Sequence, residues 1–243
     1  MLQHNAARSK ILFIVLRFTS SEFITFVHMS DIIQNTIGVV RKTLADAEGG
    51  HDWFHIERVW KNAMLIAKEE ECDMELVQLA ALLHDIADSK FHGGDEEIGP
   101  KTAANWLRSQ NYPQDRIDRI TSIIRAISFK GGANVHEDHS IEFHIVQDAD
   151  RLDAIGAIGI ARTFNYGGFK NRAIYDPAIA PNLNMTKEEY KKSTAPTINH
   201  FYEKLLLLKD LMNTESGKRI AEQRHGFMEA YLDQFYEEWN GQR

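Results

Sequence analysis

The His84-Asp85 pair stands at the end of an apolar run from Leu76 to Leu83, so an imidazole and a carboxylate follow a stretch that a folded chain would bury. Buried polar and charged groups need a partner, because leaving them unpaired costs several kcal/mol. A divalent cation is such a partner where His and Asp side chains converge. Two other segments carry the same residue types: Asp52-Trp53-Phe54-His55-Ile56-Glu57-Arg58-Val59 and Gln147-Asp148-Ala149-Asp150-Arg151-Leu152-Asp153.

These segments offer a set of imidazoles and carboxylates without a thiolate, namely His55, His84, Asp85 and Asp150. Such a set suits divalent cations such as Mn, Co, Ni, Mg, Fe and Zn. Helical bundles build metal sites from side chains on facing helices. Positions left open on the cation can take water and substrate, which allows a bound water to be activated and a phosphoryl oxygen to be polarised.

The elements that must position these residues are expected to be helices. From Asp31 onward apolar residues recur at steps of three and four, and no stretch alternates convincingly as a strand would. The pattern is clear in the runs Ile32-Ile33-Ile37-Val40-Leu44, Trp53-Ile56-Val59-Trp60-Ala63 and Ile117-Ile120-Ile123-Ile124-Ile127. Because there is no internal repeat and no linker, we predict a single all-α domain over residues 29–243.

Two stretches stand apart from this helical pattern. Residues 1–28 contain an apolar run that Arg17 interrupts, too short and broken to cross a membrane, and we expect them to be an N-terminal extension outside the fold. A long loop is expected from about Tyr166 to Met185, and loops of that length tend to be functional or mobile. The segment Thr186 to Glu189 then predicts a capping box at the start of another helix.

Composition narrows the class of protein. The 243 residues carry a net charge of −7 and no block rich in Lys and Arg, which argues against a duplex nucleic acid as partner. The single cysteine, Cys72, excludes an internal disulfide and fits a reducing, cytoplasmic location. Its acidic neighbours disfavour the thiolate, so we do not expect thiol catalysis. No membrane partner is expected.

The order His, His-Asp, Asp resembles the HD-domain superfamily of metal-dependent phosphohydrolases. The match extends to a subgroup of bacterial-type HD proteins, some of them described as nucleotide pyrophosphohydrolases, and runs from about Asp31 to the C-terminus. The blocks that carry it are Asp52-Trp53-x-His55-x-x-Arg58-Val59, Leu82-Leu83-His84-Asp85-Ile86-Ala87-Asp88-x-Lys90, Gln147-Asp148-Ala149-Asp150-Arg151-Leu152-Asp153-Ala154-Ile155-Gly156, Phe201-Tyr202-x-Lys204-Leu205 and Arg224-His225-x-x-Met228.

The resemblance implies a ligand set for the metal and a role for the neighbouring carboxylates. The implied ligands are His55, His84, Asp85 and Asp150. Asp150 is preferred to Asp148 and Asp153 because it occupies the Ala-Asp-x-Leu position of the motif. Asp153 lies one helical turn further on and could hydrogen-bond a ligand or the substrate instead.

The resemblance also suggests catalytic and substrate-binding residues. Asp88 is predicted to be the general acid/base or to orient the water, and Lys90 to neutralise phosphate charge, as Arg58 could from the same side of its helix as His55. Each has a structural alternative, as a helix-end residue or an ion-pair partner. The loop at 166–177 suits closure over a nucleotide, although it departs from the subgroup on both sides of Arg172. The predicted substrate contacts are Arg58, Lys170, Arg172, Tyr175, Lys204 and Arg224.

The function expected from the resemblance is hydrolysis of a (deoxy)nucleoside triphosphate to the monophosphate and pyrophosphate. A nucleoside monophosphate phosphatase or another HD phosphodiesterase would use much the same metal chemistry and remains an alternative. From a different class, an HD module that senses a nucleotide without turnover also remains open. In every case the expected partner is a small nucleotide. The oligomeric state is left open.

Overall fold

The structure is a computed structural model that describes residues 31–45, 47, 52–87, 95–128, 138–186, 189 and 192–242. Within these ranges every regular element is a helix, which confirms the all-α prediction. The predicted extension at residues 1–28, together with Asp88 and Lys90, lies outside the described residues. No helix in the described ranges has the length and apolar character needed to cross a membrane.

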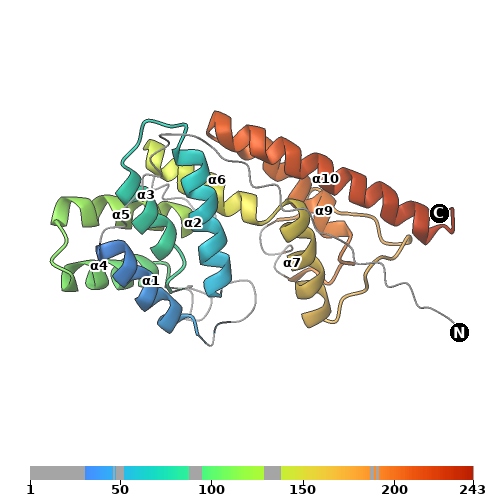
Figure 1. Ribbon diagram of the computed structural model, residues 1–243. Helices are drawn as coiled ribbons and strands as arrows, with labels where there is room; N and C mark the ends of the chain where they lie inside the picture. Colours follow the sequence, from blue (N-terminus) through green and yellow to red (C-terminus); the bar gives the residue numbers. More distant parts are fainter. Residues whose placement is uncertain are drawn as a thin grey trace, which may run out of the picture.

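The first six helices form one group, which we call the first lobe, on the left of Figure 1. Helix α2 packs against α3 and α6, α1 packs against α3, and α4 packs against α5. The bounds are α1 Asp31–Thr43, α2 Trp53–Ala67, α3 Met74–Leu83, α4 Ile98–Ser109, α5 Gln114–Ser128 and α6 Ile141–Asp153.

The remaining helices form a second lobe, on the right of Figure 1. Helix α6 leads into it, and the long helix α10 packs on both α7 and α6, so it joins the two lobes. The bounds are α7 Gly156–Phe169, α9 Asn199–Glu203, the 3₁₀ helix η2 Leu205–Leu211 and α10 Glu215–Trp239.

Helix α3 lies at the centre of the first lobe. Its N-cap, Asp73, accepts a hydrogen bond from the backbone N–H of Leu76. From Leu76 to Leu83 every residue except Gln78 is buried, which explains why this helix is apolar on all sides rather than on one stripe. The helix ends at Leu83, and the next residue, His84, is buried in the interior of the lobe.

The predicted loop from Tyr166 is wrong at its start, because α7 continues to Phe169. Gly167 does not break the helix there. It is buried, and a Cβ at this position would lie 2.3 Å from Oγ1 of Thr197, so the glycine permits a close approach of the chain that follows. The helix ends only at Lys170, and Asn171 then adopts a positive φ of 52°.

Two smaller expectations are confirmed. The backbone N–H of Thr186 donates to the carboxylate of Glu189 (2.7 Å), and the N–H of Glu189 donates to Oγ1 of Thr186 (3.2 Å), which is the reciprocal pattern of a capping box. Burial, assisted by Glu142, Asp73 and Glu70, raises the pKa of the Cys72 thiol, so the thiolate is disfavoured as its acidic neighbours suggested.

Candidate metal centre

Three of the predicted ligands converge where α2, α3 and α6 meet. His55 lies in the first turn of α2, His84 directly after α3, and Asp150 in the last turn of α6. One ligand atom from each lies within 4.8 Å of the others. Oδ1 of Asp150 is 3.6 Å from Nε2 of His55 and 3.9 Å from Nε2 of His84. Atoms that share one cation at about 2 Å are separated by similar distances, so this group can hold a divalent metal.

His84 provides the clearest sign that a cation belongs here. Its Nδ1 donates to the carbonyl of Ala81 at 2.8 Å, which leaves the lone pair on Nε2. That Nε2 is buried and has no hydrogen-bond partner among the described residues. Buried polar atoms are nearly always paired, and a cation between His84 and Asp150 would satisfy this one.

His55 is oriented by Asp153 in the same way. Its Nδ1 donates to Oδ2 of Asp153 at 2.8 Å, so Nε2 points its lone pair toward Asp150. A carboxylate that holds the far nitrogen of a histidine fixes the tautomer and raises the basicity of the metal-binding nitrogen. The sequence had suggested that Asp153 could hydrogen-bond a ligand, and it bonds the predicted ligand His55.

The Asp153 carboxylate is buried yet ionised. Arg58 donates to both of its oxygens, from Nε at 2.6 Å and Nη2 at 3.0 Å, and Arg162 donates to Oδ2 at 2.5 Å. Burial by itself would raise the pKa of Asp153, but the hydrogen bonds from His55 and Arg58 and the charge of Arg162 outweigh burial and hold that pKa well below its usual range. Asp153 therefore stays negative at any physiological pH.

Asp85 does not join the three convergent residues. It follows His84 where the chain leaves α3, and its side chain is half-buried, but it is not part of the group whose ligand atoms lie within 4.8 Å of one another. Its role as a ligand stays a prediction. The side chain of Asp150 is 39% exposed, which leaves a side of the centre open to water and substrate.

Asp148 has a structural role. It is fully buried and accepts hydrogen bonds from the backbone N–H groups of Asn213 (2.9 Å) and Thr214 (2.8 Å) and from Oγ1 of Thr214 (2.8 Å). Thr214 is in turn the N-cap of α10. Asp148 thus fastens the start of α10 to α6.

The residues predicted to bind substrate do not gather at the metal centre. Arg224 donates to the carbonyl of Leu152 (2.5 Å) and to Oδ1 of Asn62 (2.9 Å). Arg172 donates to the carbonyl of Ser193 at 2.6 Å. With Arg58 bound to Asp153, three of the predicted substrate contacts therefore also hold protein groups in place.

The other three predicted substrate contacts, Lys170, Tyr175 and Lys204, lie in the second lobe. Tyr175 packs edge-on against the rings of Phe235, Tyr236 and Trp239. Lys170 is exposed at the end of α7, with Nζ 4.9 Å from the ring centre of Phe169, and Lys204 is exposed immediately before η2. Their contact with a substrate stays a prediction.

Sequence reasoning missed two residues that support the centre. Arg162 bonds Asp153, and Asn62 donates to the carbonyl of Ala149 at 3.3 Å, next to Asp150. Asn62 follows the charged residue Lys61, and Arg162 precedes the polar residue Thr163, so neither stands out from its neighbours in the sequence. Their roles depend on partners at Asp153 and Ala149 that only the fold brings close, so no local signal was available.

Comparison with known proteins agrees with this centre. A family model described as the HD domain matches residues 53–155, which include His55, His84 and Asp150. The Bacillus subtilis protein YpgQ is 37% identical over 196 residues, covering 80% of this chain and 87% of YpgQ.

Two solved structures are similar over most of their length. An HD-superfamily hydrolase from Bacillus thuringiensis is 44% identical with a TM-score of 0.69, over 86% of this chain and 96% of that one. The structure of B. subtilis YpgQ in complex with ADP is 34% identical with a TM-score of 0.68, over 85% of this chain and 94% of that one. The chain therefore belongs to the HD-domain family and is a metal-dependent phosphohydrolase of that superfamily.

Proposed function

We propose that this protein hydrolyses nucleoside triphosphates, ribo or deoxy, to the monophosphate and pyrophosphate, with a divalent cation held by His55, His84 and Asp150. The observation that carries the metal part is the buried Nε2 of His84, which has no hydrogen-bond partner in the part of the chain that the structure describes and lies 3.9 Å from Oδ1 of Asp150. The nucleotide part is supported by the ADP complex of YpgQ and by the motif blocks that resemble pyrophosphohydrolases.

The residues of the chain have distinct roles in this reaction. When bound, the cation supplies Lewis-acid activation of a water and neutralises phosphoryl charge. Asp153 orients Nε2 of His55 toward Asp150, and Arg58 and Arg162 keep Asp153 ionised. Asp85 is proposed as a further ligand.

The bond changes follow from the proposed products. Water adds to the α-phosphorus while the bond to the oxygen bridging the α- and β-phosphates breaks, so pyrophosphate leaves with that oxygen. We assign Asp88 the role of accepting the proton of the attacking water. We assign Lys90 the role of neutralising the negative charge that develops on the phosphate. Lys170, Arg172, Tyr175 and Lys204 are proposed to contact the nucleotide.

A substrate panel tests this function. The purified full chain, stripped with a chelator and reloaded with Mn, Co or Ni, is incubated with nucleoside tri- and monophosphates, and the products are resolved by chromatography. We expect pyrophosphate and the monophosphate from triphosphates, no turnover in chelator, and no turnover by Asp150→Asn. Asp233→Asn, an exposed change on α10, serves as the matched control and should retain full activity.

Other products would point to the alternatives. Orthophosphate released from monophosphates would replace the proposal with a nucleotidase. Tight nucleotide binding without turnover in any metal would contradict hydrolysis and favour a sensing module.

A further inference from the structure

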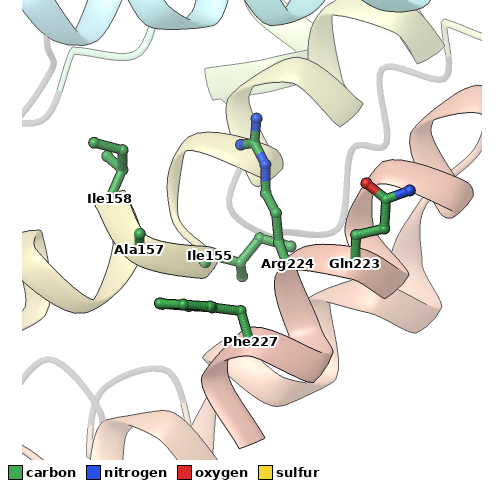
Figure 2. A pocket seen from close by; sticks show the side chains of 7 residues that line it. Ile155, Ala157, Ile158, Gln223, Arg224 and Phe227 are labelled. Carbon is green, nitrogen blue, oxygen red and sulfur yellow. The ribbon is translucent and has the colours of Figure 1, made fainter. Parts of the chain in front are cut away.

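A groove lies between α2, the start of α7 and α10, and it consists of two adjoining cavities. Their volumes are about 310 Å³ and about 200 Å³, and both are lined by Ile158 and Arg224. Figure 2 shows the larger one, where Arg224 extends from α10 with Gln223 on one side and Ala157 and Ile158 of α7 on the other. The larger cavity is at the lower end of the range of small-molecule sites, about 300–1,000 Å³.

One end of this groove is cationic. Arg58, Lys61 and Arg224 line the smaller cavity, and its one carboxylate is Asp153. Both oxygens of Asp153 already accept hydrogen bonds, from His55, Arg58 and Arg162. The bonds that Arg224 makes to Leu152 and Asn62 use two of the N–H donors of a guanidinium that carries more. Positive charge and donors therefore remain for an anion.

The other end is apolar. Most of the wall of the larger cavity is formed by Ile155, Ala157, Ile158 and Phe227, and Gln223 and Arg224 complete it toward the cationic end. Phe227 is 54% exposed and Ile158 is 44% exposed, so both side chains keep surface that a ligand can contact. A flat aromatic ring could lie against Phe227, because such stacking is favourable for any base.

The groove is separate from the metal centre. None of His55, His84 and Asp150 lines either cavity. Asp153 stands between the two places, since it lines the smaller cavity and also holds Nδ1 of His55. Arg58 also belongs to both sites, because it lines the groove and donates a hydrogen bond to Asp153, which supports the metal centre.

We propose that this groove is a second nucleotide-binding site, whose occupant places its phosphates at Arg58, Lys61 and Arg224 and its base against Phe227 and Ile158. The site needs neither the cation nor hydrolysis, so it goes beyond the proposed function. Phosphate meets guanidinium groups at the cationic end, and the aromatic base leaves water at the apolar end.

The test measures binding of ADP to the metal-stripped full chain in excess chelator, by calorimetry. We expect one bound ADP, and a loss of affinity of about tenfold or more with Lys61→Glu and with Phe227→Ala. Lys218→Glu and Leu207→Ala, both exposed and outside the groove lining, are the matched controls and should bind ADP normally. Asp150→Asn should also bind ADP normally under these conditions.

The possible results separate failure of the second site from failure of the proposed function. If ADP binds only when Mn is present, or if Asp150→Asn abolishes binding in chelator, the nucleotide occupies the metal centre alone, and the proposed hydrolysis stands. If pyrophosphate binds as tightly as ADP and Phe227→Ala has no effect, the groove takes a plain anion and not a nucleotide. If ADP binds in chelator while no metal restores triphosphate hydrolysis, the proposed function fails and the second site stands.

Discussion

At the scale of single residues, Asp153 links three helices to the metal centre. Its carboxylate accepts hydrogen bonds from His55 and Arg58 of α2 and from Arg162 of α7. Its own helix, α6, carries the predicted ligand Asp150. Asp148 lies on the same helix and is equally buried, but it binds the start of α10 instead. Of these two aspartates on α6, Asp153 therefore supports the metal centre and Asp148 supports the fold.

Substitution of these two aspartates should separate the two roles. Asp153→Asn removes the negative charge behind His55, and we expect Mn affinity to fall by about 10–100-fold, measured by calorimetry. Asp148→Asn turns an amide N–H₂ toward backbone donors, so it should lower the free energy of unfolding by about 1–3 kcal/mol with little change in Mn affinity. Equal Mn affinity for Asp153→Asn and the unaltered chain would contradict the role of Asp153.

His200 predicts a pH dependence in the second lobe. Burial, followed by the charges of Lys204 and Arg172, lowers the pKa of His200 from 6.5 to about 4. The unfolded chain therefore binds a proton that the folded chain does not between about pH 6.5 and 4, so this residue makes stability fall as pH falls through that window. Urea unfolding of His200→Gln should show a shallower loss across the same window. An unchanged slope would refute the assignment to His200.

At the scale of elements, two glycines of α10 differ in whether they allow a close contact with another helix. Gly217 sits in the first turn of α10, where a Cβ would lie 2.6 Å from Oδ2 of Asp148 and 2.6 Å from Oγ1 of Thr214. At Gly226, in the same helix, an added Cβ would meet no atom of the described residues within 4 Å. The two glycines therefore lie in the same helix, but only Gly217 is closely packed.

Alanine at these two glycines should have opposite effects on stability. Gly217→Ala must displace the buried carboxylate that holds α10, and we expect the free energy of unfolding to fall by about 1–3 kcal/mol. Gly226→Ala meets open space and should raise it by up to about 1 kcal/mol through helix propensity. Urea unfolding measures both. Stabilisation by Gly217→Ala would show that Asp148 tolerates displacement.

At the scale of the whole molecule, the sequence predicts what depends on local pattern and misses what depends on distant partners. Apolar periodicity predicts the helices, and the three motif segments predict the convergence of His55, His84 and Asp150. The role of Asp148 depends on Asn213 and Thr214, which lie more than sixty positions away. The helical placement of Gly167 depends on Thr197. Neither partner is visible in the local sequence.

The two lobes also explain why the predicted substrate contacts do not form one cluster with the metal ligands. Tyr175 packs on the last turns of α10, far along the chain and in the second lobe, whereas the metal centre lies in the first lobe. Charge and residue type identified candidates in the tail, but their positions depend on how α10 joins the lobes.

Titration of Mn into the chelator-stripped full chain, followed by calorimetry, tests most directly whether His55, His84 and Asp150 hold a cation. The unaltered chain and Asp233→Asn should each bind Mn. Asp150→Asn should lose that binding, because Oδ1 of Asp150 is the carboxylate oxygen that lies near Nε2 of both His55 and His84. Equal Mn affinity for Asp150→Asn and the unaltered chain would contradict the metal centre and, with it, the hydrolysis proposed for this protein.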